Sequence, residues 1–327
     1  MGLRVGVDVG GSKVLAGVVD GTGAVLRTAR RSTPGRRVAA AAVEDAIVDA
    51  VTAVAGTDAI SAIGVAAAGF VDREGARVVF APHLPWRGED VRARLQARFD
   101  APVLLDNDAT CAAHAESTYG AGRGIPSLLL VTLGTGIGGA LVIDGRVWRG
   151  HHGMSGEFGH MQVVPGGAEC ECGRRGCWEQ YSSGNALVRV ARSQLESQLG
   201  SPLGSHRESG PTVLAELCGG DPARLTGEMV SEAAASGDVA ARAAFSSVGR
   251  WLGEGLANLV AAFDPALVVV GGGVSVAGER LLEPARDALA GSLVGAGHRE
   301  LPGLVPAELG VVAGLVGAAA LAGAGSR

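Results

Sequence analysis

Residues 3–13 are Leu3-Arg4-Val5-Gly6-Val7-Asp8-Val9-Gly10-Gly11-Ser12-Lys13, an apolar run that ends in a carboxylate, two glycines, a hydroxyl and an ammonium. A second apolar run, 14–19, follows at once, so this stretch predicts two strands joined by a tight glycine turn. The same order returns where the apolar runs 128–133 and 140–143 flank Gly134-Thr135-Gly136-Ile137-Gly138-Gly139. Two such hairpins, each followed by alternating strands and helices, predict a duplicated α/β architecture around a central cleft.

The composition fits a soluble enzyme with two domains. The chain has 327 residues, of which 47% are hydrophobic and only 4% aromatic, so its cores depend on Ala, Val and Leu. Its 53 glycines cluster beside apolar runs, where turns are expected, and follow no collagen-like period. With 28 basic and 33 acidic residues the net charge is −5, which argues against a surface that binds nucleic acid.

Apolar periodicity predicts the other elements. The buried strands expected beyond the two hairpins are 60–68, 103–105 and 267–270. The expected helices are 38–54, 90–99, 238–263 and 279–293. The apolar helix within 238–263 fits either the core or a subunit interface. The stretch 194–210, rich in Ser, Gly and Gln, is expected to be a surface loop.

The two ends of the chain bear on its location. Residues 309–326 carry no charge and approach the length of a membrane span, but they are mostly Ala, Gly and Val and include five glycines. We therefore expect a buried terminal strand and helix there. The amino end has no cationic stretch followed by a long apolar core, so we expect no secretory signal and a cytoplasmic protein. Five cysteines in a reducing compartment fit metal ligands or core residues better than disulfides.

One imidazole and three thiols fall within a short stretch of the chain. They are His160, Cys170, Cys172 and Cys177. Together they make a complete tetrahedral set for zinc, and four protein ligands leave no open position, so the predicted zinc is structural. The alternative is a chance cluster of cysteines in a loop. Cys111 and Cys218 have no other cysteine near them in the sequence, and we expect both to be small buried hydrophobic residues.

Three glycine turns follow apolar strands and suit phosphate. The first holds Asp8, Gly10, Gly11, Ser12 and Lys13, the second Gly134, Thr135 and Gly136, and the third Gly271, Gly272 and Gly273. In the first turn, backbone amides and Lys13 can face phosphate oxygens, while Asp8 can hold Mg²⁺ directly or through water. Each turn alone fits a plain hairpin better than a ligand site. Three of them together favour a phosphate-bearing ligand.

Acidic side chains follow the strand at 103–105. Asp106, Asn107 and Asp108 come at its carboxyl end, where α/β sheets gather their ligands. Phosphoryl transfer to a hydroxyl needs a carboxylate that takes the proton, and Asp108 is our candidate. The alternative for Asp108 is the N-cap of a helix that begins at Ala109. Glu157 and Glu179 flank the predicted zinc loop and are candidates for binding sugar hydroxyls.

With these residues in view, the chain resembles the ROK family, which comprises repressors, open reading frames and sugar kinases. Within it the chain looks most like the actinobacterial glucokinases. The most specific segments are Glu157-Phe158-Gly159-His160 and Cys170-Glu171-Cys172-Gly173-Arg174-Arg175-Gly176-Cys177-Trp178-Glu179-Gln180-Tyr181. The resemblance implies the actin-like, hexokinase-type (ribonuclease H-like) fold. It implies a small domain of residues 1–107 with the terminal helix 313–327, and a large domain of residues 108–312 that carries the zinc loop 160–177.

The resemblance also implies residue roles. Asp108 matches the catalytic base, and the first two glycine turns match the phosphate contacts, while the third matches the nucleoside side. The residues that match the family's sugar ligands are Gly69, through its backbone, and Asn107, Asp108, Glu157, His160 and Glu179. His160 would serve both the zinc and the sugar through its two ring nitrogens. Some positions depart from the family pattern, among them Ser12, His83, Thr110, Cys111 and His114.

The activity implied is ATP- and Mg²⁺-dependent phosphorylation of the 6-hydroxyl of glucose, in a homodimer or homotetramer that binds neither nucleic acid nor membrane. Kinases for another hexose or an N-acetylhexosamine, and a polyphosphate-dependent glucokinase, are the nearest alternatives. A sugar-sensing transcriptional regulator is the alternative from another class. The first predicted strand begins at Leu3, which leaves no room ahead of it for a helix-turn-helix, and the net charge is acidic, so we favour the kinase.

Overall fold

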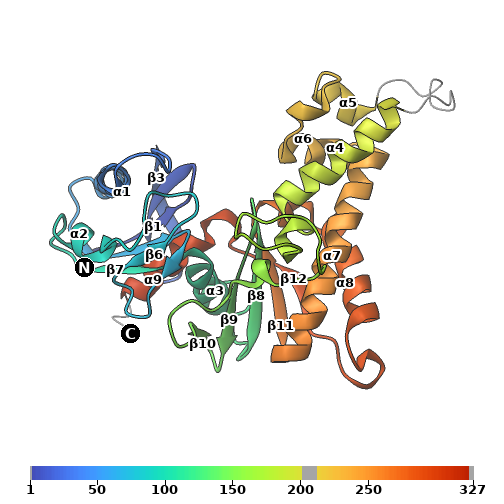
Figure 1. Ribbon diagram of the computed structural model, residues 1–327. Coiled ribbons are helices and arrows are strands. Elements are labelled where there is room, and N and C mark those ends of the chain that lie inside the picture. The colour runs from blue at the N-terminus through green and yellow to red at the C-terminus, as the bar shows by residue number, and fades with distance from the viewer. Residues whose placement is uncertain (1, 201–211, 324–327) are drawn as a thin grey trace.

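The computed structural model describes residues 2–200 and 212–323 and contains two five-stranded sheets of the same topology (Figure 1). The first sheet has the order β3-β2-β1-β4-β7, and the second has the order β10-β9-β8-β11-β12. In each, three antiparallel strands are followed by two strands parallel to the first of the three. The repeated topology confirms the duplicated α/β fold expected from the two glycine hairpins.

The strands lie close to where apolar runs predicted them. In the first sheet they are β1 (Leu3–Val9), β2 (Lys13–Val19), β3 (Val25–Ser32), β4 (Ile60–Ala67) and β7 (Val103–Asn107). In the second they are β8 (Leu128–Leu133), β9 (Ile137–Ile143), β10 (Arg146–Trp148), β11 (Leu267–Gly271) and β12 (Gly303–Pro306). A separate small hairpin consists of β5 (Phe70–Val71) and β6 (Val78–Phe80).

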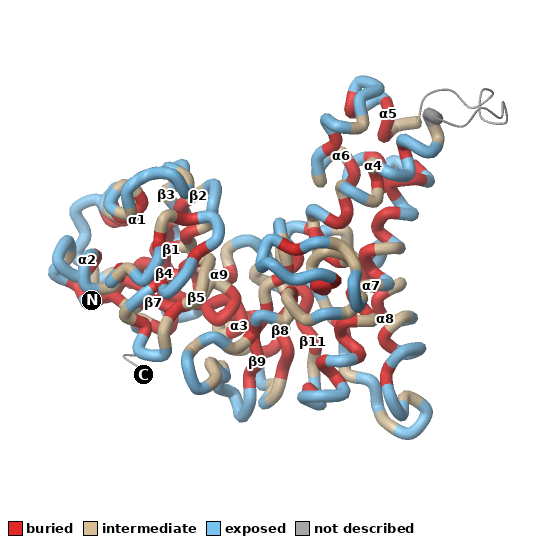
Figure 2. Tube along the Cα trace, viewed as in Figure 1, coloured by how far each residue is buried: buried red, intermediate tan, exposed pale blue. Residues whose placement is uncertain are grey.

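Successive side chains along a strand point to opposite faces of its sheet, and helices pack on each face. Leu129, Val131 and Leu133 of β8 belong to a core with helix α7, whereas Leu128 and Leu130 belong to a core with α3. In the first sheet, α1 covers one face with Val43, Ile47 and Val51. In Figure 2 buried residues run along the strands of both sheets. The strands are therefore buried on two sides, as parallel strands in α/β proteins are.

The helices of the first half are α1 (Ala40–Ala55), α2 (Val91–Gln96) and α3 (Asp108–Tyr119). Those of the second half are α4 (Gly184–Gly200), α5 (Val213–Leu217), α6 (Gly227–Ala235), α7 (Val239–Phe263), α8 (Glu279–Ser292) and α9 (Ala313–Gly323). Helices α4, α5 and α6 project from the second sheet along α7 (Figure 1). One face of α7 is buried in the core of the second half.

Two sequence-based predictions were wrong. The loop expected over 194–210 is helical up to Gly200, because α4 packs against α7 and buries Leu195 to 1% exposure; residues 201–211 lie outside the described residues. The terminal strand expected within 309–326 is replaced by a short 3₁₀ turn (Gly310–Val312) and α9. No helix among residues 2–200 and 212–323 is long and apolar enough to cross a membrane.

Helices α3 and α9 cross between the two sheets (Figure 1). Helix α3 follows β7 of the first sheet and packs on β8 and β9 of the second, while α9 follows β12 and packs on β1 and β4. Three glycines allow this close approach: a Cβ at Gly6, Gly64 or Gly317 would lie within 2.0 Å of a backbone oxygen of α9 or α3. Each half therefore contributes a helix to the other, and the β7–α3 junction lies where the halves meet.

Candidate active site

The β7–α3 junction carries Asn107 and Asp108 side by side. Asn107 is the N-cap of α3, because its Oδ1 accepts from the backbone N–H of Thr110 at 3.0 Å. Its Nδ2 donates to Oδ1 of Asp108 at 3.0 Å and to the carbonyl of Gly69 at 3.1 Å. The N-cap alternative for Asp108 is therefore wrong: Asp108 is the first helical residue, and its Oδ1 accepts from the N–H of Ala109 at 2.8 Å.

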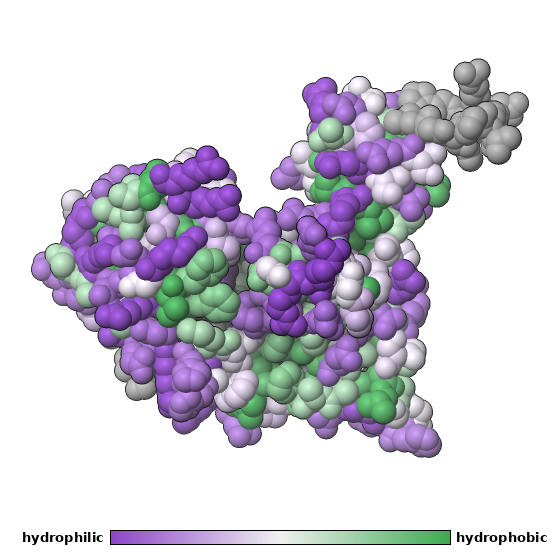
Figure 3. Space-filling view, in the orientation of Figure 1, coloured by the Kyte–Doolittle hydropathy of each residue, from purple (hydrophilic) through white to green (hydrophobic). Residues whose placement is uncertain are grey.

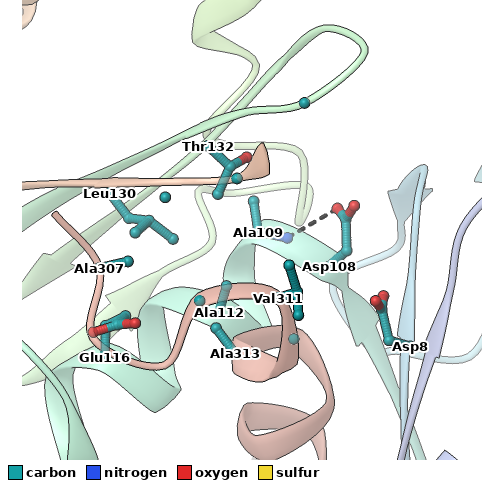
Figure 4. A pocket seen from close by; sticks show the side chains of 15 residues that line it. Asp8, Asp108, Ala109, Ala112, Glu116, Leu130, Thr132, Ala307, Val311 and Ala313 are labelled. Atoms are coloured by element: carbon teal, nitrogen blue, oxygen red, sulfur yellow. Dashed lines mark hydrogen bonds between the residues drawn. The ribbon is translucent and has the colours of Figure 1, made fainter. Parts of the chain in front are cut away.

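A cavity of about 220 Å³ opens beside this junction (Figure 4). Asp8 from β1 and Asp108 from α3 line it together with Gly134, Gly271 and Gly272. The carboxylates of Asp8 and Asp108 lie on the same side of this cavity, and Thr132 lies across from them (Figure 4). The structure thus brings the predicted base, the predicted Mg²⁺ carboxylate and two of the three glycine turns into one space.

The cavity perturbs both carboxylates. Burial, and then the nearby charge of Asp8, raise the pKa of Asp108 to about 6. Burial also raises the pKa of Asp8, while the Lys13 ammonium lowers it in part. Two partly desolvated carboxylates beside one cavity disfavour each other's ionised form, and a divalent cation would offset that cost. The donor set therefore fits Mg²⁺.

The first two glycine turns share one construction. The amide of Gly10 donates to the carbonyl of Lys13, and the amide of Gly134 donates to the carbonyl of Gly136, both at 3.0 Å. Each bond closes a turn at the carboxyl end of its first strand and leaves exposed residues at the tip, Gly11, Ser12, Gly134 and Thr135. Such tips can direct backbone amides towards an anion.

The third turn lies directly against the second. A Cβ at Gly272 would lie 2.4 Å from the carbonyl oxygen of Leu133, so a larger residue could not bring β11 and β8 so close at this end. Helix α4 begins beside them, and its Gly184 donates to the carbonyl of Gly134 at 2.8 Å. The second and third glycine turns, predicted to bind phosphate and nucleoside, are therefore neighbours at the carboxyl ends of the adjacent strands β8 and β11.

The predicted sugar ligands of the second half form a separate cluster. His160 Nε2 lies 3.9 Å from Oε2 of Glu157, and His160 Nδ1 lies 3.6 Å from Oε1 of Glu179. Burial, followed by the charges of Asp108 and Glu179, raises the pKa of Glu157 to about 7. The two glutamates thus approach the imidazole at its two different nitrogens.

The four predicted zinc ligands come together. One ligand atom from each of His160, Cys170, Cys172 and Cys177 lies within 4.8 Å of the others. Cys170 Sγ is 3.6 Å from His160 Nδ1, and Cys172 Sγ is 3.6 Å from Cys177 Sγ. One nitrogen and three sulfurs this close fit tetrahedral zinc. Nδ1 of His160 thus faces the thiols and Nε2 faces Glu157, while Cys111 and Cys218 are fully buried elsewhere.

Sequence reasoning missed two residues with polar side chains that line the cavity, Thr132 and Glu116. Glu116 of α3 has no exposed surface and accepts from the backbone N–H groups of Ala121, Glu308 and Leu309. Its spacing of eight residues from Asp108 places it about two turns along the same helix. No local signal marks it, because two of its three partners, Glu308 and Leu309, lie nearly 200 positions away in the segment before α9.

The chain matches the model of the ROK family over residues 4–324 and belongs to that family. It is 42% identical to a glucokinase of Streptomyces coelicolor over 98% of both chains. It is also similar to a ROK family glucokinase from Streptomyces griseus, whose crystal structure holds glucose and AMPPNP, at 42% identity, with a TM-score of 0.89 and coverage of 99% and 100% of the two chains. A ROK hexokinase from Thermus thermophilus shares 34% identity, with a TM-score of 0.74 and coverage of 99% and 98%.

Proposed function

We propose that this protein is a glucokinase that transfers the γ-phosphoryl group of ATP to the 6-hydroxyl of glucose. One structural observation carries the proposal: Asp108 lies at the junction of the two halves, beside a cavity that two glycine turns also line. The resemblance in sequence and fold to glucokinases, one of them with glucose and an ATP analogue bound, supports the choice of both substrates.

The acceptor sugar lies between Asn107 and Asp108 on one side and Glu157, His160 and Glu179 on the other, with the backbone at Gly69 beside it. Asp108 takes the proton of the 6-hydroxyl while that oxygen forms a bond to the γ-phosphorus. The bond from the γ-phosphorus to the bridging oxygen breaks, and ADP leaves with the electron pair. A raised pKa suits this step, since a base with a pKa near the working pH combines ionisation with basicity.

The donor lies along the three glycine turns. The turns Gly10–Lys13 and Gly134–Gly136 hold its phosphates through the backbone amides that their closing hydrogen bonds leave free, and through the Ser12 hydroxyl and the Lys13 ammonium. Gly271, Gly272 and Gly273 hold the nucleoside end. These donors are fixed before the reaction and stabilise the charge that develops on the transferring group. Mg²⁺, held from the side of Asp8, would neutralise phosphate charge when ATP is bound.

Zinc at His160, Cys170, Cys172 and Cys177 would have a structural role. It would hold together the two ends of the loop 160–177. Glu157 and Glu179 flank this loop, so the metal would orient two sugar ligands at once. The domain limits 1–107 with 313–327 and 108–312, the homodimer or homotetramer and the cytoplasmic location stay predictions.

A panel of acceptors and donors tests the proposal. Glucose, mannose, fructose and N-acetylhexosamines are assayed with ATP, with other nucleoside triphosphates and with polyphosphate. We expect the highest kcat/KM for glucose with ATP. Higher kcat/KM for another sugar, or for polyphosphate, would replace the substrate assignment.

A substitution at the proposed base is the second test. Asp108→Asn should lower kcat by at least about 100-fold while glucose still binds in calorimetry. The exposed Asp45→Asn serves as the matched control, and a near-normal kcat for Asp108→Asn would reject the base.

A further inference from the structure

Arg149 has no role in the reaction described above, yet its side chain reaches the strand that leads to Asp108. Its Nε and Nη2 lie 2.9 and 2.7 Å from Oδ2 of Asp106. Asp106 is only 4% exposed and belongs to β7 of the first sheet, whereas Arg149 directly follows β10, an edge strand of the second sheet. This partly buried ion pair therefore joins the two halves of the molecule.

Hydrogen bonds continue from this ion pair to Asp108. The other carboxylate oxygen of Asp106, Oδ1, accepts from the backbone N–H of Asn107 at 3.0 Å. Asn107 in turn donates from Nδ2 to Oδ1 of Asp108 at 3.0 Å. Because Arg149 donates twice to Oδ2 while Asn107 donates to Oδ1, the carboxylate of Asp106 is fixed in orientation. The end of β7 is thus held relative to the second sheet.

The backbone carbonyl of Arg149 also holds the segment that leads to Glu157, a second part of the proposed acceptor site. Its carbonyl accepts from the backbone N–H of Ser155 at 3.1 Å and so closes the loop 149–155. Glu157 follows this loop two residues later. Arg149 is therefore linked on one side to the segment that bears Asn107 and Asp108, and on the other to the segment that bears Glu157.

We propose that Arg149 is a positioning residue: through Asp106 it sets the distance between Asp108 and the sugar hydroxyl that the second half of the site holds. This inference rests on the proposed kinase function. Reacting groups must approach to about 3–3.5 Å, and a displacement of about 1 Å can cost about 100-fold in rate. The planar guanidinium makes two bonds to one carboxylate, which a lysine ammonium cannot reproduce with the same geometry.

Kinetics of four variants test the proposal. Arg149→Met removes the guanidinium and keeps an apolar stem, and Arg149→Lys restores only the charge. Arg149→Met combined with Asp106→Asn removes the buried negative charge together with the guanidinium and keeps an acceptor for the Asn107 amide. Arg27→Met is the control, because it breaks the exposed Arg27–Asp58 pair, which has an N–O distance of 2.7 Å.

We expect Arg149→Met to lower kcat by roughly 10- to 100-fold and to leave the KM for ATP within about twofold. Its ratio of ATP hydrolysis to glucose phosphorylation should rise, because a misplaced hydroxyl competes less well with water. Arg149→Lys should recover part of kcat, the double variant should stay slow, and Arg27→Met should match the wild type. Circular dichroism and Tm establish that each variant is folded.

Three results would overturn the proposal. If Arg149→Met lowers Tm but leaves kcat of the folded protein unchanged, the ion pair is structural only. If the KM for glucose rises at constant kcat, Arg149 contributes to sugar binding and not to the position of Asp108. If the double variant regains the wild-type kcat, the loss in Arg149→Met came from the buried negative charge of Asp106 without its guanidinium partner. A wild-type protein that phosphorylates no hexose would instead reject the proposed function.

Discussion

Nδ2 of Asn107 lies 3.0 Å from Oδ1 of Asp108, and the same Asn107 side chain caps α3 through its Oδ1. Oδ1 of Asp108 also accepts from the backbone N–H of Ala109, so this oxygen is held by the protein. In the reaction we propose, the second oxygen, Oδ2, takes the proton of the acceptor. The asparagine directly before Asp108 fixes both the start of the helix and the orientation of this carboxylate.

The pH dependence of the reaction follows from the raised pKa of Asp108. As the proposed base, Asp108 would act only when ionised. Its pKa is raised to about 6, so we expect activity to approach its maximum above this pH and to be lost as pH falls through it. We expect kcat/KM for glucose to fall about tenfold per pH unit below pH 6. Initial rates between pH 5 and 8 measure this, with Tm at each pH as a check on folding.

Glu157, whose pKa is raised to about 7, can add a second step to the same profile. Glu157→Gln should remove that step and leave the one near pH 6. A profile of Glu157→Gln that stays flat down to pH 5 would contradict the assignment of the lower step to Asp108.

The same carboxylate should lower the stability of the protein. The folded pKa of Asp108, about 6, lies above its ordinary value of 3.8, so the folded state binds the proton more tightly, and stability falls as pH rises from about 4 to about 6. Asp108→Asn removes this ionisation. We expect its Tm to exceed that of the wild type by roughly 2 °C or more at pH 8, and by less at pH 4, in scanning calorimetry without ligands.

Asp45→Asn is the control for this measurement, because Asp45 is exposed and pairs with Arg98 on the surface. A Tm of Asp108→Asn equal to or below that of the wild type at pH 8 would show that ionised Asp108 does not destabilise the fold.

Local signals in the sequence predicted the duplication and the grouping of His160 with three thiols, because a glycine turn between two apolar runs and closely spaced cysteines are short-range patterns. The N-cap of α3 was missed, since Asn107 and Asp108 are both good caps and the choice depends on where β7 ends. The helical part of 194–210 was missed because Ser and Gln give a weak signal that packing of Leu195 overrides. The pair of Asp106 and Arg149, 43 positions apart on two sheets, has no local signature.

The metal set should affect the sugar more than the nucleotide. Cys172 is exposed, so Cys172→Ala removes one predicted ligand without opening a cavity in the core. Weaker metal binding should loosen Glu157, His160 and Glu179 together, and we expect the KM for glucose to rise roughly tenfold while the KM for ATP changes less than twofold. Elemental analysis should find one zinc per wild-type chain and less in the variant.

Cys218→Ala is the control for this experiment, because it removes a thiol outside the set. It should keep both the zinc content and the KM for glucose. Wild-type protein purified without chelators that contains no bound metal would rule out the structural site.

The crossing of α3 and α9 depends on glycine. A Cβ at Gly317 would lie 1.7 Å from the carbonyl oxygen of Cys111, a backbone atom in the interior of α3 that cannot move alone. Gly317→Ala should therefore push the helices apart and lower the free energy of unfolding by about 1–3 kcal/mol, although alanine favours a helix by about 1 kcal/mol. Because α3 begins at Asp108, kcat should fall as well. Urea unfolding and kinetics on the folded fraction measure both effects.

Gly291→Ala is the control that separates the effect of helix packing on stability from the effect of helix propensity. Gly291 also lies in a helix, α8, but a Cβ there would meet no atom within 4 Å, so alanine should leave stability equal or slightly higher and kcat unchanged. The contrast between the two variants isolates the helix crossing, since both make the same chemical change. If Gly317→Ala were as stable and as active as Gly291→Ala, the close contact of α9 with α3 would not be what holds the two halves, and Asp108 would owe its position to the sheets alone.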